Sequence, residues 1–309
     1  MNALRGILPA LYTAYDEEGL FSAGRTRKLV RVLLAAGVHG YFVAGTTGEF
    51  LLLSPDERKA LAEAVTTEAA GAAPVVVHVG GVPTHIARDL ASHAASCGAS
   101  AIASIPPLYY RHSWADVCSH FEAIAERCPL PLYYYHIPQC TGRLPSLDEL
   151  ELLVEKAGVA GMKYSSTDLE LFWWLRQRLR PQFNLLSGPD ELMVACALLG
   201  ADGAIGTSYN FMPGPYLRAW EAIARGDFAL AQRWQAVANK AIAILRRYGM
   251  PAAGKAVLAL QGLACGLARG PLLAPAGERL EAMRAELERI GFFAWAWEAP
   301  ENPPEVQII

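Results

Sequence analysis

The sequence predicts a single α/β fold, a (β/α)8 TIM barrel followed by about three extra C-terminal helices. Eight short apolar runs bounded by turn residues recur through the first two thirds of the chain, and segments of helical periodicity separate them. After residue 225 only helical patterns remain. Strands that alternate with helices pair in parallel through right-handed crossovers, and eight such units close a barrel. No glycine-rich dinucleotide turn follows the first run, which favours the barrel over a doubly wound sheet.

The expected elements follow the order of the chain. Between the first two apolar runs, residues 25–37 place Leu29, Val30, Val32 and Leu33 on one broad apolar face, as an amphipathic helix does. Each later gap between runs is long enough for a similar helix. The eight expected strands are residues 7–12, 40–45, 74–80, 101–106, 130–137, 159–163, 183–187 and 203–207.

Capping-box sequences mark three helix starts. In such a box, a cap hydroxyl and a carboxylate three residues later satisfy each other's free backbone amides. After residue 225 the helical segments are 228–247, 251–264 and 277–290, and no linker precedes them. We therefore expect a barrel of residues 1–225 that holds the active site, and a helical extension of residues 226–309 packed on it. The three boxes begin at Ser54, Ser146 and Thr167.

Composition and charge exclude several classes of protein. The 309 residues are 53% hydrophobic and 18% charged, which describes a well-buried globular chain. A net charge of -3 and the lack of a basic run argue against a nucleic-acid partner, and the first residues are not apolar enough for a membrane span. The six cysteines show no CxxC or zinc-ligand spacing and the seven histidines no HxH or HExxH, so we expect reduced thiols and no metal site. Without an export signal, the expected location is cytoplasmic.

Lysine is scarce in this chain, with six lysines against twenty-one arginines, and Lys163 follows an apolar run at residues 159–162. An amine at the end of a buried strand is partly desolvated, and desolvation lowers the pKa of a lysine towards its neutral, nucleophilic form. Such an amine attacks a ketone to form an imine, whose protonated form stabilises a neighbouring carbanion or enamine. On spacing alone, a lysine ion-paired to a barrel carboxylate is the competing interpretation. The other lysines fall in or beside predicted helices, where a solvated face explains them: Lys28, Lys59, Lys156, Lys240 and Lys255.

Other polar side chains follow the ends of predicted strands, where barrel enzymes place their active sites. After the second strand, residues 45–49 (GTTGE) offer amides and hydroxyls that suit a carboxylate, although an ordinary glycine turn has the same pattern. In the fifth strand, alternation sends Tyr133 and Tyr135 to one face and Tyr134 to the other. Tyr135 lies nearer the barrel mouth, where a phenol can move protons, and its two neighbours are expected to pack. The seventh and eighth strands lead into Asp190, Glu191, Thr207 and Ser208.

Five motifs in order, GTTGE, YYYHIPQCTG, GMKYSSTDL, SGPDE and GADGAIGTSYN, carry a family resemblance. The chain resembles the N-acetylneuraminate lyase and dihydrodipicolinate synthase family of pyruvate-dependent class I aldolases over about residues 6–273. The resemblance implies a (β/α)8 barrel with appended helices, usually a homotetramer. It also implies a lysine that forms a Schiff base with pyruvate or another 2-keto acid.

Roles carried over from the family fall on particular positions of this sequence. Lys163 matches the Schiff-base lysine and Tyr135 the acid/base tyrosine. Tyr109 matches a tyrosine that, in the synthases, reaches a neighbouring subunit's site and completes a proton relay with Thr47 and Tyr135. The loop expected to bind the pyruvate carboxylate contains Thr46, Thr47 and Gly48.

The motifs are closer to the lyases than to the synthases. Synthases generally carry an arginine two residues after the proline of their YNxP motif, where it binds the carboxylate of the second substrate. Cys140 stands there in this chain, and a thiol cannot grip a carboxylate as a guanidinium does. Near Pro251, where microbial lyases often place an aromatic residue, the sequence GMPAAGK departs from the lyase pattern. By resemblance to the lyases, the sugar hydroxyls are contacted by Ser165, Gly188, Asp190, Glu191 and Thr207.

The expected activity is therefore that of a class I lyase. It would cleave N-acetylneuraminate, or a similar 2-keto-3-deoxy sugar acid, into pyruvate and an aldose such as N-acetylmannosamine. No metal or organic cofactor is expected, because the lysine imine accepts the electron pair. The enzymatic alternatives are another family aldolase or dehydratase on a shorter sugar acid, and then dihydrodipicolinate synthase. The alternative outside enzymes is a regulator that binds a sugar acid without turning it over.

Overall fold

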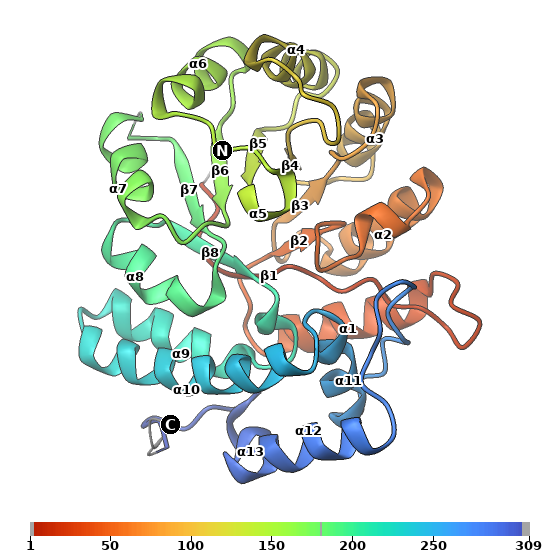
Figure 1. The fold of residues 1–309 in the computed structure, drawn as a ribbon, viewed down its shortest axis with the longest axis vertical. Helices are drawn as coiled ribbons and strands as arrows, with labels where there is room; N and C mark the ends of the chain where they lie inside the picture. Colours follow the sequence, from red (N-terminus) through yellow and green to blue (C-terminus); the bar gives the residue numbers. More distant parts are fainter. Residues whose placement is uncertain (1–2, 180, 305–309) are drawn as a thin grey trace.

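The computed structural model describes residues 3–179 and 181–304. Its eight strands form one parallel sheet in the order β1-β8-β7-β6-β5-β4-β3-β2, and a parallel bridge between Ala10 and Phe42 joins the two ends of that order. The sheet is thus a barrel, and helices surround it (Figure 1). The predicted (β/α)8 fold is confirmed. The strands are β1 Gly6–Pro9, β2 Tyr41–Val43, β3 Val75–His78, β4 Ala101–Ser104, β5 Leu132–His136, β6 Gly161–Tyr164, β7 Asn184–Ser187 and β8 Gly203–Gly206.

Each strand overlaps its predicted apolar run, and most strands are shorter than the run. The strand hydrogen bonding ends before the apolar residues do. Around the barrel lie α1 Ala23–Ala35, α2 Pro55–Ala69, α3 Thr84–Ser96, α4 Trp114–Ala125, α6 Leu147–Ala157, α7 Leu169–Arg178, α8 Met193–Leu198 and α9 Pro213–Ala224. Short turns of helix lie in the loops: α5 Pro138–Thr141, η1 Phe50–Leu52, η2 Asp190–Leu192 and η3 Ser208–Asn210.

Two of the three predicted capping boxes are present. Ser54 caps α2 and Ser146 caps α6, each with its glutamate returning the bond. The third is wrong by one residue. Asp168, not Thr167, caps α7, and its carboxylate accepts from the amide of Leu171 at 2.9 Å. A carboxylate is as good a cap as a hydroxyl, so the sequence pattern fits both neighbours.

The C-terminal helices are α10 Phe228–Arg247, α11 Ala252–Leu260, α12 Glu278–Arg289 and the short α13 Phe292–Trp295. The first has the predicted bounds, and α11 is shorter because the chain turns at Gly262, whose φ is +80°. In Figure 1 these elements, cyan for α10 and blue for the rest, lie along one edge of the barrel, where α10 packs against α9 and α12. The division into residues 1–225 and 226–309 stays a prediction.

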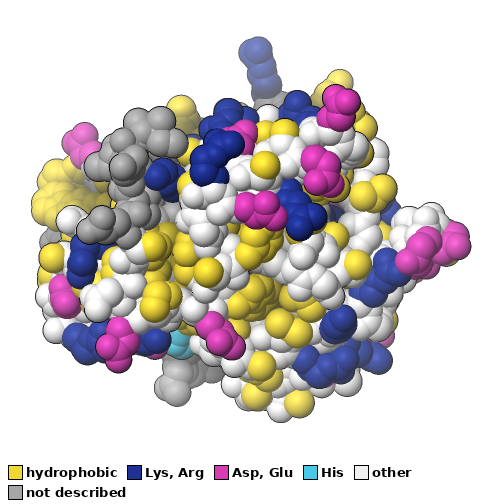
Figure 2. Space-filling view, turned by 90° about the horizontal axis from the view of Figure 1, so that it is seen from below, with side chains coloured by type: hydrophobic (Ala, Val, Ile, Leu, Met, Phe, Trp, Pro, Cys, Tyr) yellow, Lys and Arg dark blue, Asp and Glu magenta, His cyan; other side chains and the backbone are white. Residues whose placement is uncertain are grey.

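Apolar side chains form one layer inside the barrel and another between the strands and the helices. Tyr133 and Tyr135 belong to the inner layer together with Phe42, whereas Tyr134 packs in the outer layer. The predicted alternation is therefore confirmed, and it sends Tyr135 into the barrel. On the face drawn in Figure 2, basic and acidic side chains are interspersed around apolar ones. Among the described residues, no helix is long and apolar enough to cross a membrane.

Candidate active site

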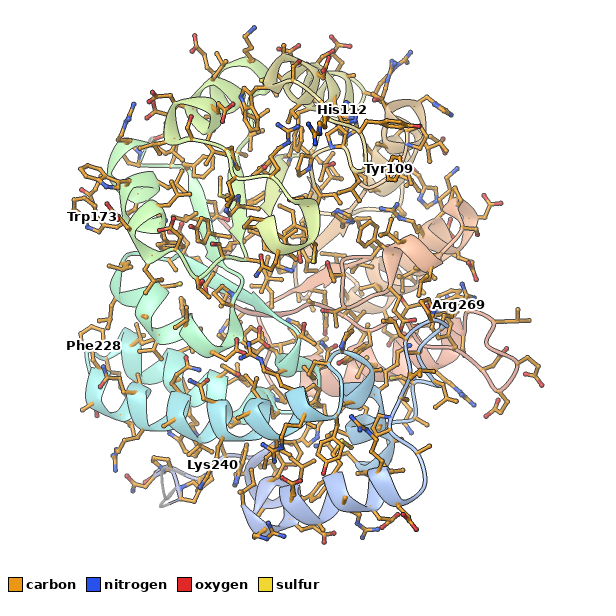
Figure 3. All side chains as sticks on the ribbon, viewed as in Figure 1. Tyr109, His112, Trp173, Phe228, Lys240 and Arg269 are labelled. Atoms are coloured by element: carbon orange, nitrogen blue, oxygen red, sulfur yellow. The ribbon has the colours of Figure 1, made fainter. Side chains whose placement is uncertain are left out.

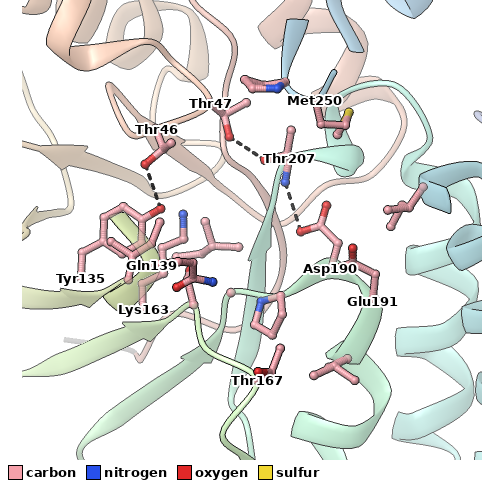
Figure 4. Close-up of a pocket in the computed structure, with 18 of the residues that line it drawn as sticks. Thr46, Thr47, Tyr135, Gln139, Lys163, Thr167, Asp190, Glu191, Thr207 and Met250 are labelled. Atoms are coloured by element: carbon pink, nitrogen blue, oxygen red, sulfur yellow. Dashed lines mark hydrogen bonds between the residues drawn. The ribbon is translucent and has the colours of Figure 1, made fainter. Parts of the chain in front are cut away.

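A cavity of about 450 Å³ opens at the carboxyl ends of the strands, where barrel proteins place their sites (Figure 4). It lies within the range of about 300–1,000 Å³ that is usual for small-molecule sites. Its polar lining comes from the loops after β2, β5, β6, β7 and β8, and its far wall from α10 and the segment before α11. The lining residues are Thr46, Thr47, Tyr135, Ile137, Gln139, Lys163, Ser165, Thr167, Gly188, Pro189, Asp190, Glu191, Leu192, Ile205, Thr207, Ile242, Arg246, Met250 and Pro251.

Lys163 lies near the end of β6 and points into the barrel, because its strand neighbours Met162 and Tyr164 pack outward. Its side chain is buried, and Nζ is 4.2 Å from the ring centroids of both Phe42 and Tyr135. Aromatic faces attract an ammonium group without tying it into an ion pair. The amine is thus held on a rigid strand at the floor of the cavity.

Two hydroxyl pairs connect loops across the mouth. The Tyr135 hydroxyl is 3.3 Å from Thr46 Oγ1, and Thr47 Oγ1 is 2.7 Å from Thr207 Oγ1. The relay expected from the resemblance joins Tyr135 to Thr47, whereas in this structure Tyr135 contacts Thr46. Figure 4 shows the Lys163 amine between these pairs. A phenol, an amine and three threonine hydroxyls therefore line the same small cavity.

Asp190 is buried at the start of η2 and holds the loop after β8. Its carboxylate accepts from the Ser208 amide at 2.7 Å, from Ser208 Oγ at 2.5 Å and from the Thr207 amide at 3.2 Å. Burial raises the pKa of Asp190 to about 6, although its hydrogen bonds from Ser208 oppose the change. The neighbouring Glu191 is ion-paired to Arg246 of α10. One carboxylate thus fixes the Thr207 backbone, and the other links the cavity to the C-terminal helices.

Ser165 and Gly188 extend the strand pairing past β6 and β7. The Ser165 amide donates to the backbone carbonyl of His136 at 2.7 Å, and the Gly188 amide donates to the backbone carbonyl of Tyr164 at 2.7 Å. A Cβ added at Gly188 would lie 2.7 Å from the Tyr164 carbonyl oxygen and from Ser165 Cα. Glycine is therefore required for the two loops to approach this closely.

Two predicted site residues do not line the cavity. Gly48 is buried behind it, where its carbonyl accepts from Thr13 Oγ1 at 2.6 Å. Tyr109 is 95% exposed and borders a separate cavity together with Tyr110 and His112. Figure 3 shows Tyr109 and His112 on the segment between β4 and α4. Cys140 is exposed and also lies outside the lining, where its neighbour Gln139 takes part.

One prediction about the lysines is wrong. Lys255 of α11 was expected on a solvated face, but its side chain is 1% exposed and its Nζ lies 2.6 Å from Glu49 Oε1. Burial lowers the pKa of Lys255, and the Glu49 carboxylate acts in the opposite direction. The helix is apolar on nearly every side, a pattern typical of a buried helix, so the burial of Lys255 could have been inferred from the sequence, although its partner Glu49 could not.

Sequence reasoning also missed part of the cavity wall. Gln139 and Thr167 lie within motifs that were noticed, but neither residue type marks a site alone. Arg246 and Met250 come from a helical region with no local pattern that points to the barrel mouth. The described residues contain no group of three or more histidine, cysteine or acidic side chains placed to hold a metal ion.

The fold and the cavity define a class: a (β/α)8 barrel with a buried lysine and a tyrosine at the mouth. The model of the dihydrodipicolinate synthetase family matches residues 3–290. Among curated relatives, the N-acetylneuraminate lyase of Citrobacter koseri is 38% identical over 82% of this chain and 86% of its own, and that of Salmonella agona is 36% identical over 94% and 98%. The solved structure of the Ruminococcus gnavus sialic acid aldolase superposes on this chain with a TM-score of 0.89 and 31% identity. The superposition covers 93% of this chain and 97% of that one. A second similar structure is a catalytic lysine mutant of the same aldolase. The chain belongs to the dihydrodipicolinate synthetase family.

Proposed function

We propose that this protein is a carbon–carbon lyase of the class I aldolase type, which cleaves N-acetylneuraminate or a similar 2-keto-3-deoxy sugar acid into pyruvate and an aldose. The observation that carries the proposal is the Lys163 amine, buried at the cavity floor with its Nζ 4.2 Å from the centre of the Tyr135 ring. The lyase relatives support the substrate class. We also propose a homotetramer, as the family resemblance implies, and the cytoplasmic location expected from the sequence.

The reaction follows from the chemistry of an amine and a phenol. Lys163 Nζ adds to the C2 ketone and water leaves, which gives an iminium ion. Tyr135 gives its proton to the departing water and becomes a phenolate. The C3–C4 bond then breaks, its electron pair moves towards the iminium nitrogen, and the phenolate takes the proton of the C4 hydroxyl as the aldehyde forms. Protonation of the enamine at C3 and addition of water release pyruvate and restore the free amine. No further electron acceptor is required.

Around this centre the loops provide binding. The Thr46 and Thr47 hydroxyls and the amides of residues 45–49 suit the substrate carboxylate. Ser165, Gly188, Asp190, Glu191 and Thr207 surround the space where the polyhydroxyl chain would extend. The apolar wall at Ile242, Met250 and Pro251 favours the second candidate, an aldolase for a shorter sugar acid that does not place an N-acetyl group there.

The test is reduction of the imine with borohydride in the presence of pyruvate, followed by intact mass and peptide mapping. One reduced pyruvyl group on Lys163, absent in Lys163→Arg and present in Lys156→Arg, supports the mechanism, since Lys156 is exposed on α6. An adduct on another lysine, or none, overturns it. Pyruvate release from N-acetylneuraminate is measured in parallel. An adduct on Lys163 without pyruvate release from N-acetylneuraminate favours the shorter sugar acid as substrate. If a sugar acid raises Tm but neither an adduct nor pyruvate release is seen, the protein is a regulator.

A further inference from the structure

Glu49 and Lys255 form a buried ion pair that the proposed reaction does not use. Lys255 Nζ lies 2.6 Å from Glu49 Oε1, and each side chain is 1% exposed. Glu49 belongs to the loop after β2, and Lys255 to α11, more than two hundred positions later in the chain. The pair therefore joins the barrel mouth to the C-terminal helical region.

The surroundings of the pair hold both charges in place. The Arg269 amide donates to Glu49 Oε2 at 2.8 Å, so residues of the C-terminal region contact both carboxylate oxygens. Lys255 Nζ also donates to the Leu267 carbonyl at 3.4 Å and lies 4.1 Å from the centre of the Tyr15 ring, over which the Arg269 guanidinium lies at 4.4 Å. Figure 3 shows Arg269 beside the first elements of the barrel.

Glu49 is also the last residue of the loop that carries the two threonines. Its φ of +59° is in the left-handed region, which is unusual for a residue other than glycine, and its amide donates to the Thr46 carbonyl at 3.0 Å. Thr46 contacts Tyr135, and Thr47 pairs with Thr207. A shift of the Glu49 side chain would therefore move the hydroxyls at the cavity.

Stability does not explain such a pair. Removing two charges from water is costly, and well-packed apolar residues in place of a buried ion pair often leave a protein equally stable or more stable. The pair does fix one orientation of the loop, because the carboxylate has to face an amine and an amide that both come from the C-terminal region.

We propose that the Glu49–Lys255 ion pair is a positioning device, which holds the loop of residues 45–49 so that Thr46 and Thr47 meet the carboxylate of the 2-keto acid. The proposal rests on the proposed function for its kinetic consequence. The C-terminal helices then set substrate affinity although they supply no reacting group.

The experiment compares Lys255→Met, the double variant Glu49→Gln with Lys255→Met, and the control Lys59→Met. Lys59 forms an equally short ion pair with Asp89, at 2.6 Å, but on the surface. Lys255→Met leaves the buried Glu49 carboxylate without its amine partner and is expected to lower Tm. The double variant removes both charges of the pair, so it tests the position of the loop rather than folding. Hydrogen exchange of a peptide covering residues 45–49 and the pyruvate concentration for half-maximal borohydride trapping are measured for each.

In the double variant we expect faster exchange in this loop. We also expect the KM for the sugar acid, and the pyruvate concentration for half-maximal trapping, to rise by about 10- to 100-fold, with kcat close to wild type. A small displacement of the groups that bind the carboxylate weakens substrate binding. Lys59→Met is expected to match wild type. A double variant with wild-type loop exchange overturns the proposal. The exchange measurement needs no substrate, so this failure is distinct from the absence of a wild-type adduct, which would overturn the proposed function instead.

Discussion

At the scale of single residues, two buried lysines show how surroundings decide a role. Lys255 has a carboxylate at 2.6 Å, which satisfies its charge and leaves it structural. Within the described part of the chain, no carboxylate lies within ion-pair distance of Lys163, and its amine is held by two aromatic rings. The competing interpretation of Lys163, an amine ion-paired to a barrel carboxylate, thus describes Lys255. An amine without a fixed anion remains available to a ketone.

Tyr135 and Tyr133 allow a matched test of the phenol. Both rings lie inside the barrel, but the Tyr135 hydroxyl faces Thr46 at the cavity and the Tyr133 hydroxyl donates to Asn184 Oδ1 at 2.8 Å. Tyr135→Phe is expected to lower kcat by about 10²- to 10⁴-fold while Tm stays close to wild type. Tyr133→Phe is expected to cost about 1 kcal/mol of stability and to keep its kcat. Equal kcat values for both variants would remove the proton-transfer role.

The buried carboxyl of Asp190 predicts a pH dependence. Its pKa of about 6 in the folded protein exceeds the value of about 3.9 for an exposed aspartate, so the folded state binds more protons between those values. The contribution of this group to the free energy of unfolding therefore falls as the pH rises from about 4 to 6, by at most about 1.4 kcal/mol per pH unit.

Asp190→Asn removes this titration. Its amide group also faces the amides of Thr207 and Ser208, so a lower Tm is expected at every pH. The diagnostic quantity is the slope of the unfolding free energy with pH, obtained from denaturant titrations between pH 4 and 7. Wild type is expected to lose stability faster than Asp190→Asn as the pH rises from 4 to 6, and parallel curves would contradict the assignment.

At the scale of elements, the cavity depends on the close approach of the loops after β6 and β7. Gly188→Ala places a Cβ 2.7 Å from the Tyr164 carbonyl oxygen, so the two loops have to separate. We expect a loss of about 1–3 kcal/mol in stability together with a lower kcat/KM, because Ser165 moves with the backbone. Gly24→Ala is the control: a Cβ there meets nothing within 4 Å, and in a helix alanine is favoured by about 0.5–1 kcal/mol. Calorimetry and steady-state kinetics on both variants provide the measurement.

The elements also show what the sequence could and could not predict. Lys163 and Tyr135 were found because strand alternation and position at a strand end are local properties. The cap of α7 was misplaced by one residue because Thr167 and Asp168 both fit the pattern. The partner of Lys255 and the place of Arg246 depend on how α10 and α11 pack on distant loops, and no local periodicity carries that information.

At the scale of the whole molecule, Tyr109 is the exposed one of the two predicted site residues, Gly48 and Tyr109, that lie outside the cavity. It is 95% exposed, with a φ of +72° that is uncommon for a bulky residue, and the neighbouring Tyr110 is 73% exposed. Exposed rings around a hollow on a monomer are typical of an association surface. In the proposed tetramer, a second copy would cover this surface, and Tyr109 would reach that copy's site, as the resemblance to the synthases implies.

This assembly predicts that activity depends on protein concentration. When the protein is diluted until the tetramer dissociates, the specific activity is expected to fall in parallel with the molecular mass. Light scattering measures that mass. Tyr109→Phe is expected to keep the mass and to lose about 10- to 100-fold in kcat, because it removes one hydroxyl of a proton relay. Tyr110→Phe, which changes the adjacent exposed ring in the same way, is the control and should keep both. If Tyr109→Phe retains full kcat as an assembled protein, the proton passes through the chain's own Tyr135 and Thr46, and association serves stability alone.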